Sequence, residues 1–260
     1  MGPEYPNVLD RVVQIVHELV LIPSVFFEPR KAPIHGSAVS VKGSATLFSG
    51  TGGVGKSSAL LRLAAEKRQD IAFMADDMSI VSGEGELFGN MAYPKIYGYN
   101  WDAMPVGVKL LEGRPVLDKL HFHALRKLNP SKVRRKISPV RLFSASDFDA
   151  SLGDLVFIFR SDVQRPKFQQ LDFEKAAELQ LHIMKTEYTV IFNHIEWAEY
   201  NAKVSGLEPI LQSSELYSGW LRVYRSAFRE SRNRVLHLPF NFPNDQLDGI
   251  LLGDFGLNFD

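Results

Sequence analysis

The amino-acid sequence predicts one α/β domain preceded by an N-terminal helical extension. Short apolar runs typical of buried strands alternate along the chain with helical patterns, and this order is typical of a sheet with helices packed on its faces. The chain has 260 residues, of which 45% are hydrophobic and 23% charged, enough to build a sizeable core. We expect the extension to comprise residues 1–32 and the domain residues 33–260.

The composition excludes several classes of chemistry. The 30 basic residues balance the 30 acidic ones, so no overall charge draws the chain to nucleic acid or to an anionic membrane. The absence of cysteine excludes disulfides, thiol catalysis and cysteine-ligated zinc. We find neither an uninterrupted apolar stretch of membrane-spanning length nor a signal-peptide pattern. We therefore expect a cytoplasmic protein that binds neither nucleic acid nor membrane.

The first predicted element is an amphipathic helix within residues 12–27. Its apolar positions recur at helical spacing, and we expect them to pack on the core: Val12, Val13, Val16, Leu19 and Val20. A strand over residues 37–41 follows. Lys42 and Gly43 then form a turn into a second strand over residues 45–48.

The later elements are predicted from the same periodicities. An apolar strand over residues 71–75 is followed by two strands joined by a hairpin turn at residues 82–86. The remaining predictions are a strand over residues 155–159, helices over residues 173–184 and 216–228, and a last strand over residues 235–238.

A glycine-rich loop between the second strand and a helix over residues 59–64 gives the clearest chemical signal. Residues 50–57 read GTGGVGKS and fit the pattern G-x-x-x-x-G-K-[ST]. In such a loop the backbone N–H groups cradle phosphates, the lysine reaches the β- and γ-phosphates, and the hydroxyl binds Mg²⁺. A glycine-rich turn without function is the alternative. The pattern predicts a nucleoside triphosphate held by Gly50, Thr51, Gly52, Gly53, Val54, Gly55, Lys56, Ser57 and Ser58.

Two consecutive aspartates, Asp76 and Asp77, end the apolar run at residues 71–75. Ligands bind at the carboxyl ends of strands in open α/β sheets. One carboxylate there could hold Mg²⁺ together with Ser57, while the other accepts a proton from an attacking hydroxyl. A turn or helix-cap role is the alternative, and the sequence leaves open which aspartate does which.

These motifs together resemble the HPr kinase/phosphorylase family and the wider set of phosphoenolpyruvate-carboxykinase-like P-loop kinases. The resemblance covers residues 34–82 and rests on the segment IHGSAV that begins at Ile34, the glycine loop and the Asp76-Asp77 pair. It implies a mixed sheet flanked by helices, ATP and Mg²⁺ as cofactors, and His35 at the border of the catalytic centre. The family's later glycine-rich signature is missing, and an aromatic segment, residues 93–101, occupies that region.

Other candidate side chains have an ordinary structural alternative. Cations that could stabilise a transferring phosphoryl group are Lys132, Arg134, Arg135, Arg160, Arg165, Arg222 and Arg225. The cluster at residues 132–136 is slightly favoured among them, although solvated surface charge is the general rule. Aromatic side chains that could stack a base or line an acceptor pocket are Tyr93, Tyr97, Tyr99 and Trp101.

The leading hypothesis is an ATP-dependent kinase whose catalytic residues are His35, Lys56, Asp76 and Asp77. Its acceptor would be a hydroxyl of a protein, a peptide or a small metabolite, and the protein could form a homo-oligomer. The main alternative is a regulatory nucleotide-binding protein or ATPase without a second substrate. A nucleotide-free interaction module is a third hypothesis, disfavoured by the intact Lys56, Ser57 and aspartate pair.

Overall fold

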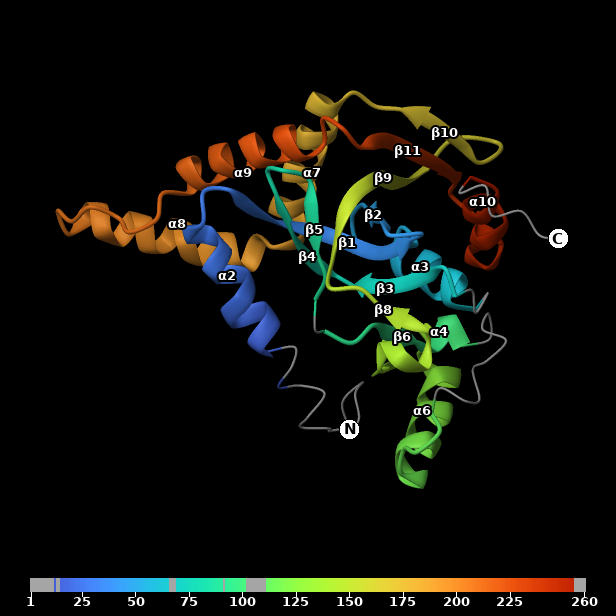
Figure 1. Ribbon diagram of the computed structural model, residues 1–260. Helices are drawn as coiled ribbons and strands as arrows, with labels where there is room; N and C mark the ends of the chain where they lie inside the picture. The colour runs from blue at the N-terminus through green and yellow to red at the C-terminus, as the bar shows by residue number, and fades with distance from the viewer. Residues whose placement is uncertain (1–11, 13–14, 66–68, 91, 102–110, 255–260) are drawn as a thin grey trace.

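A nine-stranded mixed sheet forms the centre of the computed structural model, which describes residue 12 and residues 15–65, 69–90, 92–101 and 111–254. Helices lie on both sides of this curved sheet (Figure 1). Its strands are β1 (Lys31–Val41), β2 (Ser44–Ser49), β3 (Ile71–Ala75), β4 (Met78–Ser82), β5 (Glu86–Phe88), β8 (Ala145–Ser146), β9 (Asp149–Ser161), β10 (Lys167–Gln170) and β11 (Arg232–Pro239).

Strand β1 organises the part of the sheet that carries the sequence motifs. Its second half pairs antiparallel with β2 on one side and β3 on the other, and its first half pairs antiparallel with β4. Strand β9 in turn runs parallel to β2 and β11. Gly36 of β1 is opposite Ser49 at the end of β2, and Ala38 is opposite Ala75 at the end of β3. The middle of β1 and the carboxyl ends of β2 and β3 therefore meet at one place.

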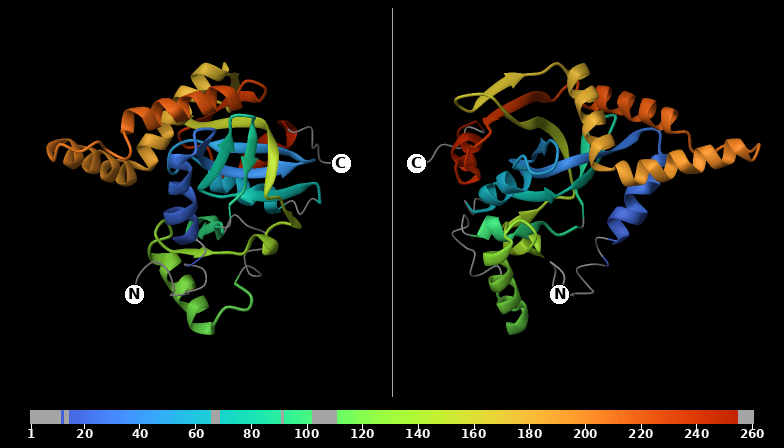
Figure 2. Two further views of the ribbon diagram at one scale, coloured as in Figure 1. Left: turned by 60° about the vertical axis from the view of Figure 1, so that its left-hand side comes forward. Right: turned by 180° about the vertical axis from the view of Figure 1, so that it is seen from behind.

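The two faces of the sheet pack against different helices, because successive strand residues point to opposite faces. Phe48 and Val156 belong to the core shared with α3 (Lys56–Ala65) and α10 (Leu247–Asp254). Leu47 and Phe157 belong to the core shared with α7 (Phe173–Glu187) and α9 (Ser213–Ala227). Helix α8 (Thr189–Val204) projects away from the sheet beside α9, as the views in Figures 1 and 2 agree.

A smaller unit lies below the sheet in the view of Figure 1. It comprises a two-stranded sheet of β6 (Lys95–Tyr97) and β7 (Arg134–Lys136) together with α4 (Gly98–Trp101) and α6 (Val116–Leu128). Short 3-10 helices η3 (Pro139–Arg141) and η4 (Asn244–Gln246) complete the later elements. No helix in the described ranges has both the length and the apolar character needed to cross a bilayer.

Most predicted strands and helices are confirmed, with ends shifted by a few residues. The hairpin between β4 and β5 is present, and the turn at Lys42 and Gly43 has positive φ at both residues. The predicted helix over residues 173–184 extends to Glu187. Helices α6, α8 and α10 and the strands β6, β7, β8 and β10 were not predicted.

The prediction for the N-terminal helix is wrong in its packing. The segment is helical, through η1 (His17–Leu21), α2 (Ile22–Ser24) and η2 (Val25–Phe27). The residues expected in the core are instead 40–66% exposed: Val12, Val16, Leu19 and Val20. Val13 lies outside the described residues. The buried positions of this segment are His17, Ile22 and Val25. The π-helical turn η1 changes the angular phase of the positions that follow it.

Candidate functional site

The glycine loop lies between β2 and the first turn of α3, so the chain runs strand, loop, helix. Gly50 and Gly55 have φ angles of +141° and +120°, which other residues rarely adopt. A Cβ on Gly50 would also lie 2.8 Å from the carbonyl oxygen of Ile158 in β9. The buried Lys56 amine donates hydrogen bonds to the carbonyl oxygens of Gly50 (2.7 Å) and Thr51 (2.8 Å). The lysine thereby folds back over its own loop.

Asp76 lies at the centre of a buried hydrogen-bond network. Its Oδ1 accepts hydrogen bonds from the hydroxyls of Ser37 (2.7 Å) and Ser57 (3.0 Å), and its Oδ2 accepts one from the Lys95 backbone N–H (3.3 Å). Asn90 donates a side-chain hydrogen bond to the Asp76 carbonyl at 2.9 Å. Through Asp76, which follows β3, these contacts connect three other elements: β1 through Ser37, α3 through Ser57 and β6 through Lys95.

Asp77 has a different environment from its neighbour. Its φ of +73° places it in the left-handed region, where a non-glycine residue is uncommon and is often found at a functional site. Its carboxylate forms a salt bridge with Lys95 Nζ, and its side chain is 38% exposed. Of the two aspartates, it is therefore the more accessible from solvent.

The surroundings separate the pKa values of the two carboxyl groups. Burial, reinforced by the adjacent negative charge of Asp77, raises the pKa of Asp76. Burial is also the largest single influence on Asp77 and opposes its ionisation, but the charge and hydrogen bond of Lys95, together with the charges of His35 and Lys56, outweigh it and lower the Asp77 pKa. The salt bridge with Asp77 in turn raises the pKa of Lys95, although the burial of Lys95 acts in the opposite direction. Asp77 is thus the carboxylate held in its ionised form.

His35 is buried beside the loop and is neutral at pH 7. Burial and the nearby charge of Lys56 lower the pKa of His35 to about 4. Neither ring nitrogen forms a hydrogen bond of normal geometry within the described ranges, and Nε2 lies 3.9 Å from Glu187 Oε2. The ring packs near the edge of Tyr188, with 6.0 Å between the ring centroids.

Glu187 is a site residue that sequence reasoning missed. It is the last residue of α7, and its Oε1 accepts a hydrogen bond of 2.6 Å from the Gly52 backbone N–H. The contact joins residues separated by 135 positions in the sequence. Glu187 belongs to no motif, so only the tertiary structure reveals that it faces the glycine loop.

These groups surround one cavity of about 420 Å³, which is within the usual range for small-molecule sites. Gly50, Thr51 and Val54 belong to the loop but do not line it. The cavity lies between the loop, the middle of β1, the end of β3, and β6. Its lining residues are His35, Gly52, Gly53, Gly55, Lys56, Ser57, Ser58, Asp76, Asp77, Lys95, Tyr97, Tyr99, Glu187 and Asn244.

The donors near Asp76 fit a hard cation such as Mg²⁺. Ser57 and Asp76 present neighbouring oxygen atoms, 3.0 Å apart. Mg²⁺ takes one or two protein oxygen ligands and completes its shell with phosphate oxygens and water. Within the described ranges no three His, Asp or Glu side chains gather as a possible metal site.

The aromatic candidates divide into two groups. Tyr97 and Tyr99 line the cavity as a stacked pair, with ring centroids 5.4 Å apart and an interplanar angle of 13°. Trp101 is buried and packs against Phe122 in the core. Tyr93 is partly buried and does not line the cavity.

The basic candidates also differ in position. Arg135, in the cluster that was slightly favoured, is buried and bonded to Asp118 at 2.6 Å, whereas Lys132 is exposed. Arg134 lies at the edge of the site, with Nη1 3.4 Å from the Tyr97 hydroxyl. Arg160 is nearest to the loop, because a Cβ on Gly55 would lie 3.9 Å from its Nη2.

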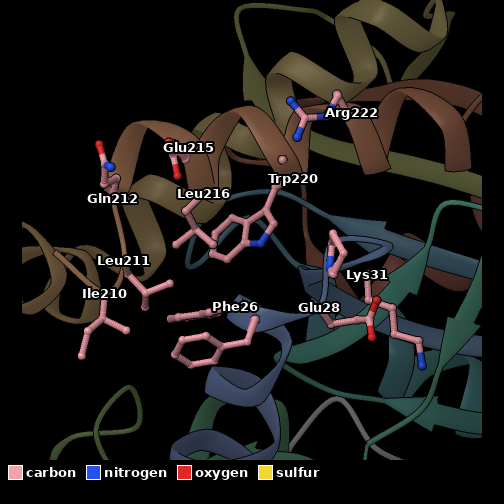
Figure 3. A pocket seen from close by; sticks show the side chains of 13 residues that line it. Phe26, Glu28, Lys31, Ile210, Leu211, Gln212, Glu215, Leu216, Trp220 and Arg222 are labelled. Atoms are coloured by element: carbon pink, nitrogen blue, oxygen red, sulfur yellow. The ribbon is translucent and has the colours of Figure 1, made fainter. Parts of the chain in front are cut away.

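The other basic candidates lie outside the cavity. Arg165 is exposed and Arg225 pairs with Glu174. Arg222 lies beside a second hollow of about 200 Å³, between α9 and the N-terminal segment. Figure 3 shows Trp220 and Leu216 of α9 facing Phe26 there, with Arg222 pointing away from these rings. This hollow shares no lining residue with the cavity at the glycine loop.

Comparison with known proteins gives little further information. No family model matches the chain, and no curated protein matches its sequence. One similar solved structure is the Hpr(Ser) kinase/phosphatase from Coxiella burnetii, with 15% identity, coverage of 54% of this chain and 76% of that chain, and a TM-score of 0.28. At these values the similarity is partial and structural only. The assignment that follows therefore depends on the geometry of the site.

Proposed function

We propose that the chain is an ATP-dependent phosphotransferase that uses Mg²⁺ and transfers the γ-phosphate to a hydroxyl acceptor. The observation that carries this proposal is the hydrogen bond between Ser57 of the glycine loop and Asp76 at the end of β3. A loop that merely turned the chain would need neither the buried Lys56 amine nor a carboxylate beside its hydroxyl. Phosphoryl transfer in P-loop enzymes uses both groups together, the lysine at the phosphates and the carboxylate with the hydroxyl at Mg²⁺.

Ser57 and Asp76 would hold Mg²⁺, which supplies neutralisation of phosphate charge when it is bound. The loop N–H groups and Lys56 would orient the phosphates at the start of α3, a 10-residue helix whose N-terminal dipole also favours an anion. Tyr97 and Tyr99 would line the space for the acceptor or the base.

Asp77 would accept the proton of the acceptor hydroxyl. It is ionised and more accessible than Asp76, which is already engaged by two hydroxyls. Its lowered pKa makes it a weak base, but a loose phosphoryl-transfer transition state needs little proton abstraction before the phosphorus–oxygen bond breaks. Lys95, paired with the Asp77 carboxylate, would position it.

The test is transfer of labelled γ-phosphate from ATP into fractionated cell extract by the wild-type protein and by the Asp77→Asn and Asp76→Asn variants. We expect Asp77→Asn to lower transfer by at least about a hundredfold while MgATP still binds. Asp76→Asn should weaken Mg²⁺-dependent binding itself, because it removes a proposed metal ligand. The matched control is Asp162→Asn, at an exposed aspartate after β9.

Unchanged transfer by Asp77→Asn would contradict the proposed base. Label released only as free phosphate would identify an ATPase instead of a kinase. Neither result would decide whether the loop binds a nucleotide, which is tested separately by measuring MgATP binding.

A further inference from the structure

The carboxylate of Glu187 lies on the glycine loop, on the side that faces the cavity. Its Oε1 accepts the Gly52 N–H at 2.6 Å, and a Cβ on Gly52 would lie 3.7 Å from both carboxylate oxygens. The other oxygen faces His35 Nε2 at 3.9 Å. An anion that forms part of the protein therefore occupies a backbone N–H of the loop that would otherwise cradle phosphate.

Glu187 also lies close enough to the loop lysine to act on its amine. In a loop of this pattern the lysine amine reaches the β- and γ-phosphates. Among the charged groups around Lys56, Glu187 is the carboxylate with the largest electrostatic effect on the amine, ahead of Asp77 and Asp76. Glu187 and His35 also share the cavity with the two aspartates, where the acceptor is proposed to enter.

We infer that Glu187 is a specificity-determining residue of the proposed nucleotide site, whose carboxylate competes with the terminal phosphate and so selects against a triphosphate relative to a diphosphate. The inference rests on the proposed function. A bound diphosphate would leave the Gly52 N–H to Glu187, so the diphosphate and the carboxylate could be accommodated together. The γ-phosphate of a triphosphate would compete for the same N–H, and two anions that share one hydrogen-bond donor repel strongly in a partly buried site.

Glu187 lies where two helices meet. The residue ends α7, Tyr188 caps that helix, and α8 begins at Thr189. The backbone that carries the carboxylate is therefore held by both helices.

The test measures the affinity of ADP and of a non-hydrolysable ATP analogue, each with Mg²⁺, by calorimetric titration of the full chain. The variants are Glu187→Gln, which removes the charge but keeps the side-chain size, and Glu187→Ala, which also removes the contact. We expect both to bind the ATP analogue about tenfold more tightly than the wild type, with ADP changed less than about twofold. The matched control is Glu178→Gln, at an exposed residue of the same helix, which should change neither affinity.

Equal changes for the two nucleotides, or weaker binding of the ATP analogue by both variants, would overturn the inference while the proposed function stands. Absence of binding to the wild type and to both variants would overturn the proposed function as well. Far-ultraviolet circular dichroism and urea unfolding of each variant establish that the proteins compared are folded.

Discussion

The separate environments of Asp76 and Asp77 give adjacent, chemically identical side chains different contacts and opposite pKa shifts. Asp76 is enclosed by two hydroxyls and a backbone N–H, whereas Asp77 is strained in its backbone and paired with Lys95. Burial raises the pKa of Asp76, whereas at Asp77 the opposing effects of Lys95, His35 and Lys56 together exceed that of burial and lower the pKa. Two carboxyl groups whose pKa values are pushed in opposite directions are typical of an active site.

His35 predicts a specific dependence of stability on pH. Its folded pKa of about 4 lies below the ordinary value of 6.5, so between these values the unfolded chain binds a proton that the folded chain does not. The imidazole therefore contributes stability that is present above pH 6.5 and is lost as the pH falls toward 4. The full effect corresponds to about 3 kcal/mol.

Urea unfolding at pH 7 and at pH 4.5 measures this effect in the wild type and in His35→Gln. We expect the loss of unfolding free energy on acidification to be smaller in the variant. His17→Gln is the natural comparison, because burial lowers the pKa of His17 as well. An identical pH dependence in the wild type and His35→Gln would show that His35 is not held neutral.

The unit of β6, β7 and α6 is held together by a buried ion pair. Arg135 of β7 bonds to Asp118 of α6 at 2.6 Å, and its guanidinium lies 5.3 Å from the Phe122 ring centroid. Both charged side chains are almost completely buried. Arg135 is therefore a structural cation and not one that reaches a nucleotide. Through β6 this unit carries Lys95 and Tyr97 to the cavity.

Replacement of Arg135 by leucine should destabilise the protein by about 3 kcal/mol, because it leaves the Asp118 carboxylate buried with one partner fewer. Chemical denaturation measures the change. In the fraction that remains folded, MgATP affinity should stay within about threefold of the wild type. Arg165→Leu, at an exposed position, is the control. A stable Arg135→Leu protein that no longer binds nucleotide would instead place this arginine in the site.

Sequence patterns predicted those helices and strands that are determined by neighbouring residues. The strand, glycine loop and helix from Ser44 to Ala65 follow from neighbouring residues, as does the strand β3 that directly precedes Asp76. Helix α8 was missed because its first residues, Thr189, Val190 and Ile191, are β-branched and favour strands. The packing predicted for the N-terminal helix was wrong because periodicity identifies an apolar stripe and not the surface that covers it, and because the π-helical turn shifts the phase after His17.

The missed part of the site comes from distant segments. Glu187, Lys95 and Asn244 reach the cavity from three different elements, and none belongs to a motif. Their positions depend on how α7, β6 and the segment before α10 pack on the sheet. A single sequence contains no short-range signal for such packing.

At the scale of the whole molecule, the cavity lies where three strands and the smaller unit meet. Helices α3 and α10 pack on one face of the sheet and α7 packs on the other. The first core therefore positions the glycine loop, and the second positions Glu187 at the end of α7. Nucleotide binding should therefore stabilise the entire fold, as any ligand of the folded state does.

The most direct test of the central claim is calorimetric titration of a non-hydrolysable ATP analogue, with and without Mg²⁺, into the wild-type protein and Lys56→Met. We predict saturable, Mg²⁺-dependent binding to the wild type. The variant should bind about tenfold to a hundredfold more weakly, because it loses charged hydrogen bonds to the phosphates. Lys127→Met, at an exposed lysine of α6, should match the wild type. Equal binding by the wild type and Lys56→Met, or binding by neither, would contradict a nucleotide site at the Gly50–Ser58 loop.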